Sequence, residues 1–318
     1  MILADARGEA RLDVLYWASQ VRRANFGNQV KFCTIAAGKV GACGEDCRWC
    51  SQSARYATHI PPQPARATVA SLVQASEEAL RSGAFCFSIV NSGRGPSQED
   101  LQEFQTAAAA IAAAGREVRG ASLGVLDDDT AARLYAMGVR RYNHNLETSR
   151  RFYTSVVSSH DYDSRLATLA AARRAGMQLC CGGIFGLGET WEDRVDLALT
   201  LREEVRPDTS PLNFLHPIPG TPLQGNTPLE PMECLHIVAL FRLMLPRVDL
   251  KVAGGRQVNL RELQSWMYYA GATSCMVGNY LTTVGRDVQA DKQLLADLGL
   301  ELVTEFTKPA AASPARQA

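Results

Sequence analysis

The sequence has no excess of either charge and no long apolar run. Lys+Arg and Asp+Glu each number 33, so the formal net charge is zero, which argues against electrostatic capture of nucleic acid or of an anionic membrane. No apolar stretch approaches the length of a membrane span, and the N-terminal segment lacks the basic and apolar regions of a signal peptide. We therefore expect a cytoplasmic protein whose nine cysteines serve as metal ligands, catalytic groups or buried thiols rather than disulfides.

The sequence also lacks the glycine signatures of nucleotide binding. The glycine-rich stretch GGIFGLGE (182–189) is not followed by the Lys-Ser/Thr pair of a phosphate-binding loop. Instead, apolar runs rich in β-forming residues alternate with amphipathic segments of helical length. The expected strands cover residues 30–36, 85–90, 117–124, 140–147, 177–186, 211–217, 249–255 and 273–278. A first helix is expected at 12–25, followed by helices at 67–82, 98–114, 128–137, 162–175, 190–205, 231–245, 259–270 and 287–298.

This alternation predicts a parallel sheet with helical crossovers. In a chain of 318 residues, eight strand–helix pairs favour an α/β fold made of a single (β/α)8 TIM-type barrel. A doubly wound open sheet is the alternative, because periodicity does not reveal closure. We expect an N-terminal helical segment at 1–28, the barrel at 29–303 and a disordered, Ala/Pro/Ser-rich tail at 304–318.

Three cysteines crowd into the long loop after the first expected strand. Cys43, Cys47 and Cys50 are spaced C-x3-C-x2-C in GACGEDCRWCSQS (41–53), and loops at this end of barrel strands carry chemistry. Structural zinc prefers four ligands, usually in two pairs, and no second C-x2-C is present. An iron–sulfur cluster normally has four thiolates, so a four-iron cluster held by three would keep one iron open to an external ligand. A zinc loop or incidental thiols are the plainer alternatives.

A C-x3-C-x2-C motif early in a (β/α) chain resembles the radical S-adenosylmethionine (SAM) superfamily. In that superfamily the open iron of a [4Fe–4S] cluster binds the amino and carboxylate groups of SAM. An electron from the cluster then cleaves SAM and yields a 5′-deoxyadenosyl radical. The residue before the last cysteine is usually aromatic and packs near the adenine, and here it is Trp49.

Within this superfamily the chain resembles the biotin synthases. The segments GACGEDCRWCSQSARY (41–56), YNHNLETS (142–149), GGIFGLGET (182–190) and PLNFLHPIPGTPL (211–223) are similar to that family, and the resemblance runs in order from about residue 10 to 300. It implies sulfur insertion into dethiobiotin, in which two unactivated C–H bonds are broken by radicals. It also implies a flavodoxin- or ferredoxin-type electron donor and a homodimer.

The resemblance also implies roles for four polar residues. Asn145 and Asn213 match asparagines that hydrogen-bond the cyclic urea of dethiobiotin, and an amide offers the donor and acceptor that a urea edge needs. Glu147 matches an acidic residue, commonly Asp, that binds the SAM ribose. Arg165 matches a position near the SAM carboxylate. The alternatives are strand-end capping for the asparagines and a solvated helix face for the arginine.

The auxiliary cluster that serves biotin synthases as sulfur donor is altered in this sequence. In relatives it is a [2Fe–2S] cluster bound by three cysteines and one arginine. Cys86 and Cys180 match the first and third cysteines, whereas Gly120 stands at the second. The arginine position meets Gly255, and Arg256 comes one residue late.

Extra thiols elsewhere suggest that this cluster is rebuilt rather than lost. Cys33 lies on the first expected strand, and Cys181 directly follows Cys180. Our hypothesis is an auxiliary iron–sulfur cluster with all-cysteine ligation by Cys33, Cys86, Cys180 and Cys181 and with more than two irons. Neighbours on a regular strand point to opposite faces, so both Cys180 and Cys181 can face the lumen only if the following glycines make the strand end irregular. Otherwise one of them is a core thiol, as we expect of the two remaining cysteines, Cys234 and Cys275.

Two further interpretations remain open. One is another radical SAM barrel enzyme of the maturase or mutase type, which the altered auxiliary positions favour and Asn145 and Asn213 disfavour. The other is a non-catalytic barrel that binds zinc through the cysteine triplet. Metal content separates the second from the radical enzymes, and product analysis separates the radical enzymes from each other.

Overall fold

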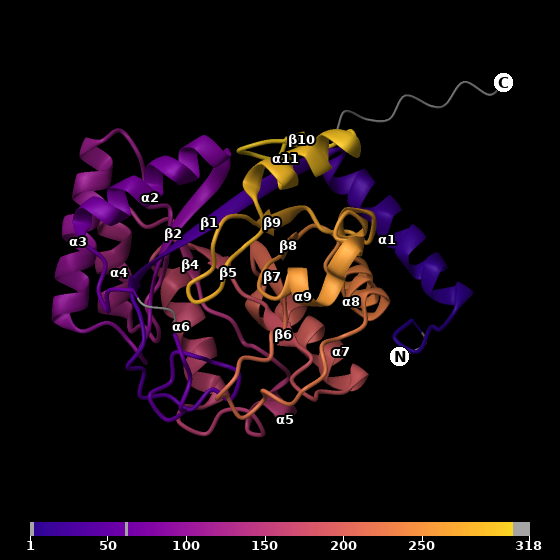
Figure 1. Ribbon diagram of the computed structural model, residues 1–318, viewed down its shortest axis with the longest axis horizontal. Coiled ribbons are helices and arrows are strands. Elements are labelled where there is room, and N and C mark those ends of the chain that lie inside the picture. The colour runs from indigo at the N-terminus through magenta and orange to yellow at the C-terminus, as the bar shows by residue number, and fades with distance from the viewer. Residues whose placement is uncertain (1–2, 61–62, 308–318) are drawn as a thin grey trace.

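Parallel strands close into a barrel in the computed structural model, which describes residues 3–60 and 63–307 (Figure 1). The strands are β1 (Gln29–Lys39), β2 (Ala84–Asn91), β3 (Gly120–Ser122), β4 (Arg141–Asn143), β5 (Gln178–Cys180), β6 (Gly183–Phe185), β7 (Thr209–Phe214), β8 (Asp249–Val252), β9 (Ser274–Met276) and β10 (Glu301–Leu302). They pair in the order β1-β2-β3-β4-β5-β7-β8-β9, and β9 pairs with β1 to complete the ring. Because β5 and β6 form two parts of one barrel strand beside β7, the (β/α)8 prediction is confirmed and the open sheet is wrong.

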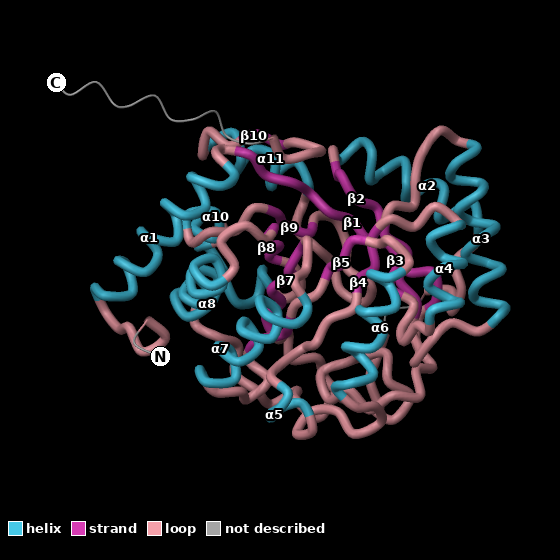
Figure 2. Tube along the Cα trace, turned by 180° about the vertical axis from the view of Figure 1, so that it is seen from behind, coloured by secondary structure: helices cyan, strands magenta, loops and turns pink. Residues whose placement is uncertain are grey.

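Helices surround the strands (Figure 2). They are α1 (Glu9–Phe26), α2 (Val69–Ser82), α3 (Gln98–Ala113), α4 (Asp128–Ala136), α5 (Arg150–Tyr153), α6 (Tyr162–Arg174), α7 (Trp191–Thr200) with the π-helical η1 (Leu201–Val205), α8 (Pro231–Met244), α9 (Arg256–Leu260), the 3-10 helix η2 (Arg261–Leu263), α10 (Trp266–Tyr269) and α11 (Val288–Asp297). Apolar side chains between the two layers, such as Ile89, Leu134, Leu179 and Phe241, form a continuous buried core. Burial of this layer drives the folding of the barrel.

Local signals set the junction between α2 and β2. The Thr68 side chain accepts a hydrogen bond from the Ser71 backbone N–H and so begins α2. Gly83 ends the helix with a left-handed φ of 78°, which glycine adopts without steric cost. A Cβ at Gly83 would also lie 2.8 Å from a methyl group of Leu302 in β10, so glycine also allows β10 to pack closely there.

Two expected elements are interrupted by positive φ angles at non-glycine residues. The strand expected at 140–147 ends at Asn143, and Glu147 adopts a φ of 71°. The helix expected at 259–270 is divided among α9, η2 and α10, because Arg261 has a φ of 48°, which lies outside the helical range. The short helix α5 and the strand β10 were not expected.

The loop that carries the cysteine triplet is closed at its base. The backbone of Lys39, at the end of β1, pairs antiparallel with Arg66, just before α2. Lys39 Nζ lies 3.3 Å and Arg66 Nη1 lies 3.0 Å from the carboxylate of Asp100, which is 2% exposed. One buried carboxylate at the start of α3 therefore holds both ends of the loop.

The described end of the chain returns to the N-terminal side of the barrel. Residues 304–307, where we expected the disordered tail to begin, pack against α1 and β1. The ring of Phe306 meets that of Phe26 edge-on at 5.0 Å between centroids, and the Gln29 side chain exchanges hydrogen bonds of 3.0 and 2.7 Å with the Thr307 backbone. The rest of the expected tail, 308–318, lies outside the described residues.

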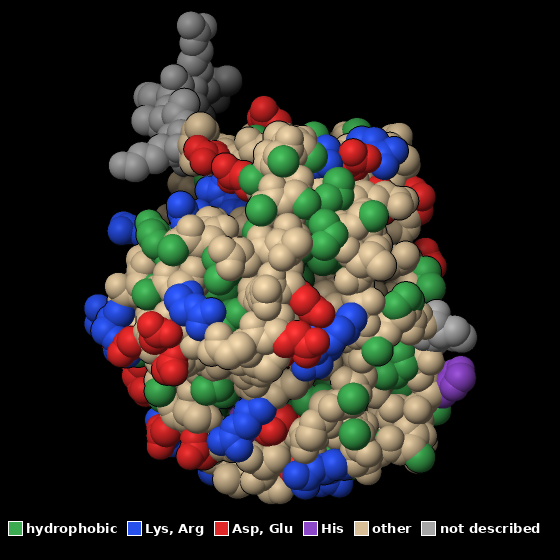
Figure 3. Space-filling view, turned by 90° about the vertical axis from the view of Figure 1, so that its left-hand side faces the viewer, with side chains coloured by type: hydrophobic (Ala, Val, Ile, Leu, Met, Phe, Trp, Pro, Cys, Tyr) green, Lys and Arg blue, Asp and Glu red, His purple; other side chains and the backbone are tan. Residues whose placement is uncertain are grey.

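The surface mixes charges of both signs. On the face shown in Figure 3, Lys and Arg side chains alternate with Asp and Glu, so no field of one sign dominates it. Across residues 3–60 and 63–307, no helix has the length and apolar character needed to cross a bilayer.

Candidate active site

A cavity of about 240 Å³ lies at the C-terminal end of the barrel, against the cysteine loop. Its lining comes from that loop, from the ends of β2, β3 and β4, and from the segment leading into α6: Cys43, Glu45, Cys47, Trp49, Cys50, Gln52, Asn91, Ser92, Gly93, Arg94, Ser122, Gly124, Val125, His144, Glu147, His160 and Arg165. The C-terminal end is where (β/α)8 barrels place their chemistry. The structure thus brings together the triplet, Trp49, Glu147 and Arg165, as expected.

The three thiols of the triplet all line this cavity. The loop folds back on itself, since Cys43 N donates to Gln52 O at 3.1 Å and Ala54 N donates to Cys43 O at 2.8 Å. Burial raises the pKa of the Cys47 and Cys50 thiols, so both are protonated at neutral pH until a metal displaces the proton. In the described part of the chain, no three His, Cys, Asp or Glu side chains are already gathered tightly around a single ion position. Three soft sulfur donors on one cavity wall fit an iron–sulfur cluster.

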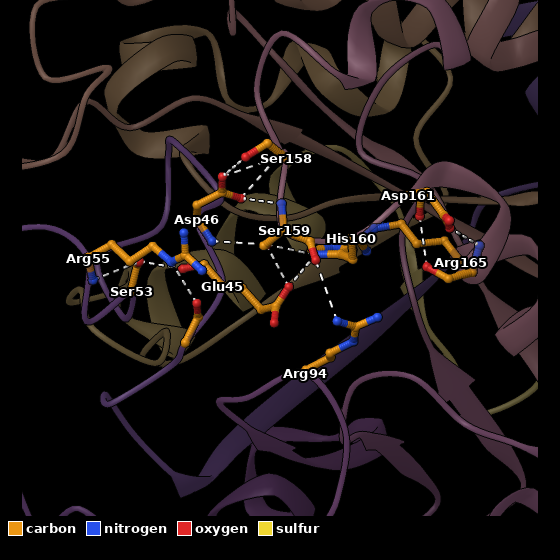
Figure 4. Close-up of polar contacts among 12 residues, drawn as sticks. Glu45, Asp46, Ser53, Arg55, Arg94, Ser158, Ser159, His160, Asp161 and Arg165 are labelled. Atoms are coloured by element: carbon orange, nitrogen blue, oxygen red, sulfur yellow. Dashed lines mark hydrogen bonds and ion pairs between the residues drawn. The ribbon is translucent and has the colours of Figure 1, made fainter.

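Polar contacts fasten the cysteine loop to the segment between α5 and α6 (Figure 4). The Asp46 carboxylate accepts hydrogen bonds from the backbone N–H groups of Ser158 and Ser159, each at 3.0 Å. Ser159 Oγ donates to the Glu45 carboxylate at 2.6 Å. The residues between the cysteines thus hold the loop in place.

Arg165 reaches the cavity from α6. Its Nε donates to Tyr153 OH at 2.7 Å, and its Nη1 donates to the Asn145 carbonyl oxygen at 2.7 Å. Nη1 also lies 3.7 Å from Glu147 Oε1. Because the residue is 7% exposed, the solvated helix face considered for Arg165 is wrong.

Glu147 occupies a strained and partly unsatisfied position. Its φ of 71° is left-handed, a conformation that costs a non-glycine residue energy and concentrates at functional sites. Burial raises the pKa of its carboxyl, and Arg165 opposes this. Its Oε2 is buried and has no hydrogen-bond partner among the described residues. A buried acceptor of this kind on a cavity wall suits a ligand hydroxyl.

Both asparagines are oriented by backbone groups. Asn213 Nδ2 donates to Gly183 O at 3.0 Å, and its Oδ1 accepts from Gly254 N at 2.8 Å. Asn145 Oδ1 accepts from Gly182 N at 3.2 Å. The strand-end role considered for them is therefore real, and each amide still keeps a donor hydrogen and an acceptor lone pair for a ligand.

A second group of thiols lies deeper in the barrel lumen. Cys33 on β1 pairs in register with Cys86 on β2, and Cys180 is on β5. All three are at most 3% exposed. Burial raises the pKa of Cys33 to about 12, Lys251 and Arg141 oppose this, and Cys86 adds to it. The three thiols and two cations therefore share one buried environment.

Lys251 contacts one of these thiols, and Arg141 lies close enough to interact electrostatically with all three. Lys251 Nζ, on β8, lies 3.4 Å from Cys180 Sγ. Arg141, on β4, is 3% exposed, and its Nε and Nη1 have no hydrogen-bond partner among the described residues. Burial opposes its charge, but the nearby cysteines, as thiolates, together with Asp249 outweigh burial and raise the pKa of Arg141.

The position expected for an arginine ligand differs in the structure. We expected it at Gly255, with Arg256 one residue later. Because β8 ends at Val252, both residues lie past the strand: Gly255 turns the chain with a φ of 73°, and Arg256 forms a buried ion pair with Asp291. Neither residue therefore reaches the thiols, and the cation that β8 directs at them is Lys251.

Cys181 does not join the lumen thiols. It belongs, like Leu179, to the apolar core between strands and helices, and it lies close enough to Tyr162 of α6 to influence its pKa. Cys180 faces the lumen, so the two neighbours follow the ordinary alternation of a strand. The expected set of four thiols is therefore divided into three in the lumen and one outside it.

Gly120 faces the lumen where relatives would carry a cysteine. A Cβ at this position would lie 2.1 Å from Ser88 Oγ. Ser88 accepts a hydrogen bond from Asn143 Nδ2 at 3.1 Å and lies 3.6 Å from Cys86 Sγ. Ser88 therefore fills the space that a side chain on β3 would need.

Sequence reasoning missed four residues of these two sites. Lys251 had a readable signal, because it interrupts the apolar strand DLKVAGG and a buried cation needs a partner. Arg141 had a weaker signal of the same kind, because it is a cation within the strand expected at 140–147. Glu45 and His160 had none, since they meet across 115 positions of the chain, with Glu45 Oε2 2.5 Å from His160 Nδ1.

Comparisons with known families agree with this geometry. The model of the radical SAM superfamily matches residues 39–201, and that of the Biotin and Thiamin Synthesis associated domain matches residues 211–301. The biotin synthase of Trichlorobacter lovleyi is 48% identical over 292 residues, which cover 92% of this chain and 87% of that protein. The biotin synthase of Geobacter sulfurreducens is 48% identical over 284 residues, which cover 89% and 86%.

Solved structures share the fold at much lower identity. Methylornithine synthase (PylB) superposes with a TM-score of 0.80 at 20% identity, covering 95% of this chain and 92% of that one. The hydrogenase maturase HydG gives a TM-score of 0.79 at 16% identity, covering 95% and 71%. These likenesses concern the barrel alone, whereas the family models and the 48% identical relatives establish that the chain belongs to the biotin synthase family of the radical SAM superfamily.

Proposed function

We propose that the protein converts dethiobiotin to biotin by radical insertion of sulfur. The observation that carries this proposal is the presence of two separate sets of three thiols along one barrel. One group lines the cavity at the C-terminal end and the other lies deeper in the lumen: Cys43, Cys47 and Cys50, then Cys33, Cys86 and Cys180. A radical generator and a sulfur donor need this arrangement, with the substrate between them.

In this proposal, the cavity at the C-terminal end of the barrel holds a [4Fe–4S] cluster and SAM. The three thiolates of the triplet leave one iron open, and the cluster supplies the electron that cleaves SAM when both are bound. Arg165 forms an ion pair with the SAM carboxylate, and the unpartnered Oε2 of Glu147 accepts a hydrogen bond from a ribose hydroxyl. Trp49, on the cavity wall, packs against the adenine.

The substrate is oriented by amides rather than by acids or bases. The C–H bonds to be broken have no acidity on which a general base can act, so the side chains position the substrate and exclude water. Asn145 and Asn213 are fixed by backbone groups and offer their remaining donor and acceptor to the cyclic urea of dethiobiotin.

The lumen site holds the auxiliary cluster that donates sulfur. Cys33, Cys86 and Cys180 are its protein thiolates, and Lys251 and Arg141 balance its negative charge, because an uncompensated anion in a buried site is costly. Cys181 remains a core thiol. We keep the expectation of more than two irons in this cluster, which iron analysis measures directly.

Product analysis tests the reaction. The protein is reconstituted anaerobically with iron and sulfide, reduced, and given SAM and dethiobiotin. Biotin and 5′-deoxyadenosine are expected together. Deoxyadenosine without biotin would favour another radical SAM reaction of the maturase or mutase type. If neither biotin nor deoxyadenosine forms, that result would count against the radical chemistry itself.

Iron and sulfide content tests the lumen site. The double variant Cys33→Ala, Cys86→Ala is expected to lose the auxiliary iron and retain that of the triplet. The matched control Cys181→Ala is expected to retain all the iron of the unmodified protein. If the double variant also keeps all its iron, these residues hold no second cluster.

The partners belong to the same proposal. We propose a flavodoxin- or ferredoxin-type electron donor, a homodimer and a cytoplasmic location. Turnover driven by reduced flavodoxin or ferredoxin tests the donor, and light scattering on the reconstituted protein tests the dimer.

A further inference from the structure

His160 lies between the cysteine loop and Arg165 (Figure 4). Its Nδ1 is 2.5 Å from Glu45 Oε2, and its Nε2 is 2.9 Å from Arg165 Nη2. All three side chains line the same cavity as the triplet. A continuous chain of contacts therefore runs from a residue between Cys43 and Cys47 to the guanidinium of α6.

The direction of each hydrogen bond in this chain is fixed. A guanidinium has only donors, so Arg165 donates and His160 Nε2 accepts. The proton of the neutral imidazole must then sit on Nδ1, from which it is donated to the carboxylate of Glu45. His160 thus acts as a neutral bridge with one defined tautomer.

Two further hydrogen-bond donors of Arg165 are engaged within the protein. Nε donates to Tyr153 OH and Nη1 to Asn145 O, both at 2.7 Å. Nη1 also faces Glu147 at 3.7 Å. Three of the five N–H groups are therefore bound within the protein, and the His160 contact holds the Nη2 end.

We propose that Glu45 and His160 are a positioning pair that sets the Arg165 guanidinium for the carboxylate of SAM and links it to the cysteine loop. This inference rests on the assignment of Arg165 to the SAM carboxylate. His160 acts through Arg165 and does not touch SAM. Fixing a guanidinium before binding reduces the entropy lost when the ligand arrives, so the pair contributes to SAM affinity.

Two substitutions of His160 separate its two contacts. His160→Gln places an amide near the position of Nε2 and can still accept from Arg165. His160→Asn places an amide near the position of Nδ1 and can meet only Glu45. We expect His160→Asn to weaken SAM binding to the reconstituted enzyme by about tenfold or more, the loss typical of one hydrogen bond to a charged group. We expect His160→Gln to recover most of that loss.

The measurements are the SAM dissociation constant, by equilibrium dialysis with labelled SAM, iron content, and the KM for dethiobiotin. Iron content and this KM are expected to stay near their unmodified values in both variants, because the pair acts on SAM. The exposed His59, as His59→Gln, is the matched control and is expected to change none of the three.

The other outcomes are distinct. Unchanged SAM affinity in His160→Asn would overturn the inference, as would weaker binding in His160→Gln than in His160→Asn, since that pattern means that only the Glu45 contact matters. The variant Arg165→Gln tests the underlying assignment separately. If Arg165→Gln binds SAM normally, the role of Arg165 fails, whatever His160 does.

Discussion

Lys251 Nζ lies 3.4 Å from Cys180 Sγ, a contact that crosses from β8 to β5 inside the barrel. Lys251 is only 6% exposed. Burial alone lowers its pKa, but Cys180, Cys33 and Cys86, once they are thiolates, outweigh burial and raise it. Thiolate ligands at this site and a charged ammonium therefore stabilise each other, as the proposed auxiliary cluster requires.

Lys251→Met is expected to shift the reduction potential of that cluster to a more negative value. Methionine keeps the length of the side chain and removes the charge, and a nearby positive charge favours the more negative, reduced state. A potentiometric titration followed by electron paramagnetic resonance measures the shift. Lys292→Met, which alters a lysine on α11 outside the barrel, is the control. Equal potentials in both variants would show that Lys251 does not face a cluster.

Arg256→Met is expected to destabilise the fold without altering the auxiliary cluster. The change leaves Asp291, which is 2% exposed, without its main partner, a loss worth about 3 kcal/mol of unfolding free energy. Urea denaturation measures this loss. Adding Asp291→Leu should restore part of the stability, because the unpaired charge is removed as well. A changed cluster spectrum in Arg256→Met would instead show that Arg256 acts on the cluster.

Gly120→Cys, which supplies the cysteine that the family resemblance implies at this position, is expected to destabilise the protein by about 1–3 kcal/mol, the usual cost of overpacking. The reason is Ser88 Oγ, only 2.1 Å from the new Cβ. In the background of Ser88→Gly, the same Gly120→Cys change should cost much less unfolding free energy. Urea denaturation of the double variant and of Ser88→Gly alone measures this cost. If Gly120→Cys is as stable as the unmodified protein, Ser88 does not block the position.

The barrel and the triplet could be predicted because each depends on local sequence. The period of the apolar residues and the spacing of Cys43, Cys47 and Cys50 are visible over short stretches. The alternation of a strand even supplied the objection that Cys180 and Cys181 cannot both face the lumen, and the structure places them on opposite faces.

Contacts between distant segments account for what the sequence did not reveal. Strand β8 ends at Val252, before the turn that Gly255 makes with a φ of 73°, so a register that met Gly255 lay past the strand and overlooked Lys251. The pairing of Glu45 with His160 depends on the cysteine loop folding onto the segment before α6. No periodicity in the sequence predicts such a contact between distant segments.

Asp100→Asn is expected to weaken the base of the cysteine loop in a pH-dependent way. Burial opposes the charge of Asp100, but hydrogen bonds from Ser97 and the charge of Lys39 outweigh it and lower the pKa of the carboxyl. A folded pKa below the unfolded value, about 4, means that the stabilisation is present above that value and is lost as the pH falls through the folded pKa. The variant should therefore lose about 1–3 kcal/mol of unfolding free energy at pH 7 and approach the unmodified protein at low pH. Urea denaturation across this range measures the difference.

The control Glu99→Gln alters an exposed partner of Arg66 and should change the unfolding free energy little at any pH. A loss in Asp100→Asn that does not vary with pH would show that the charge of Asp100 does not hold the loop.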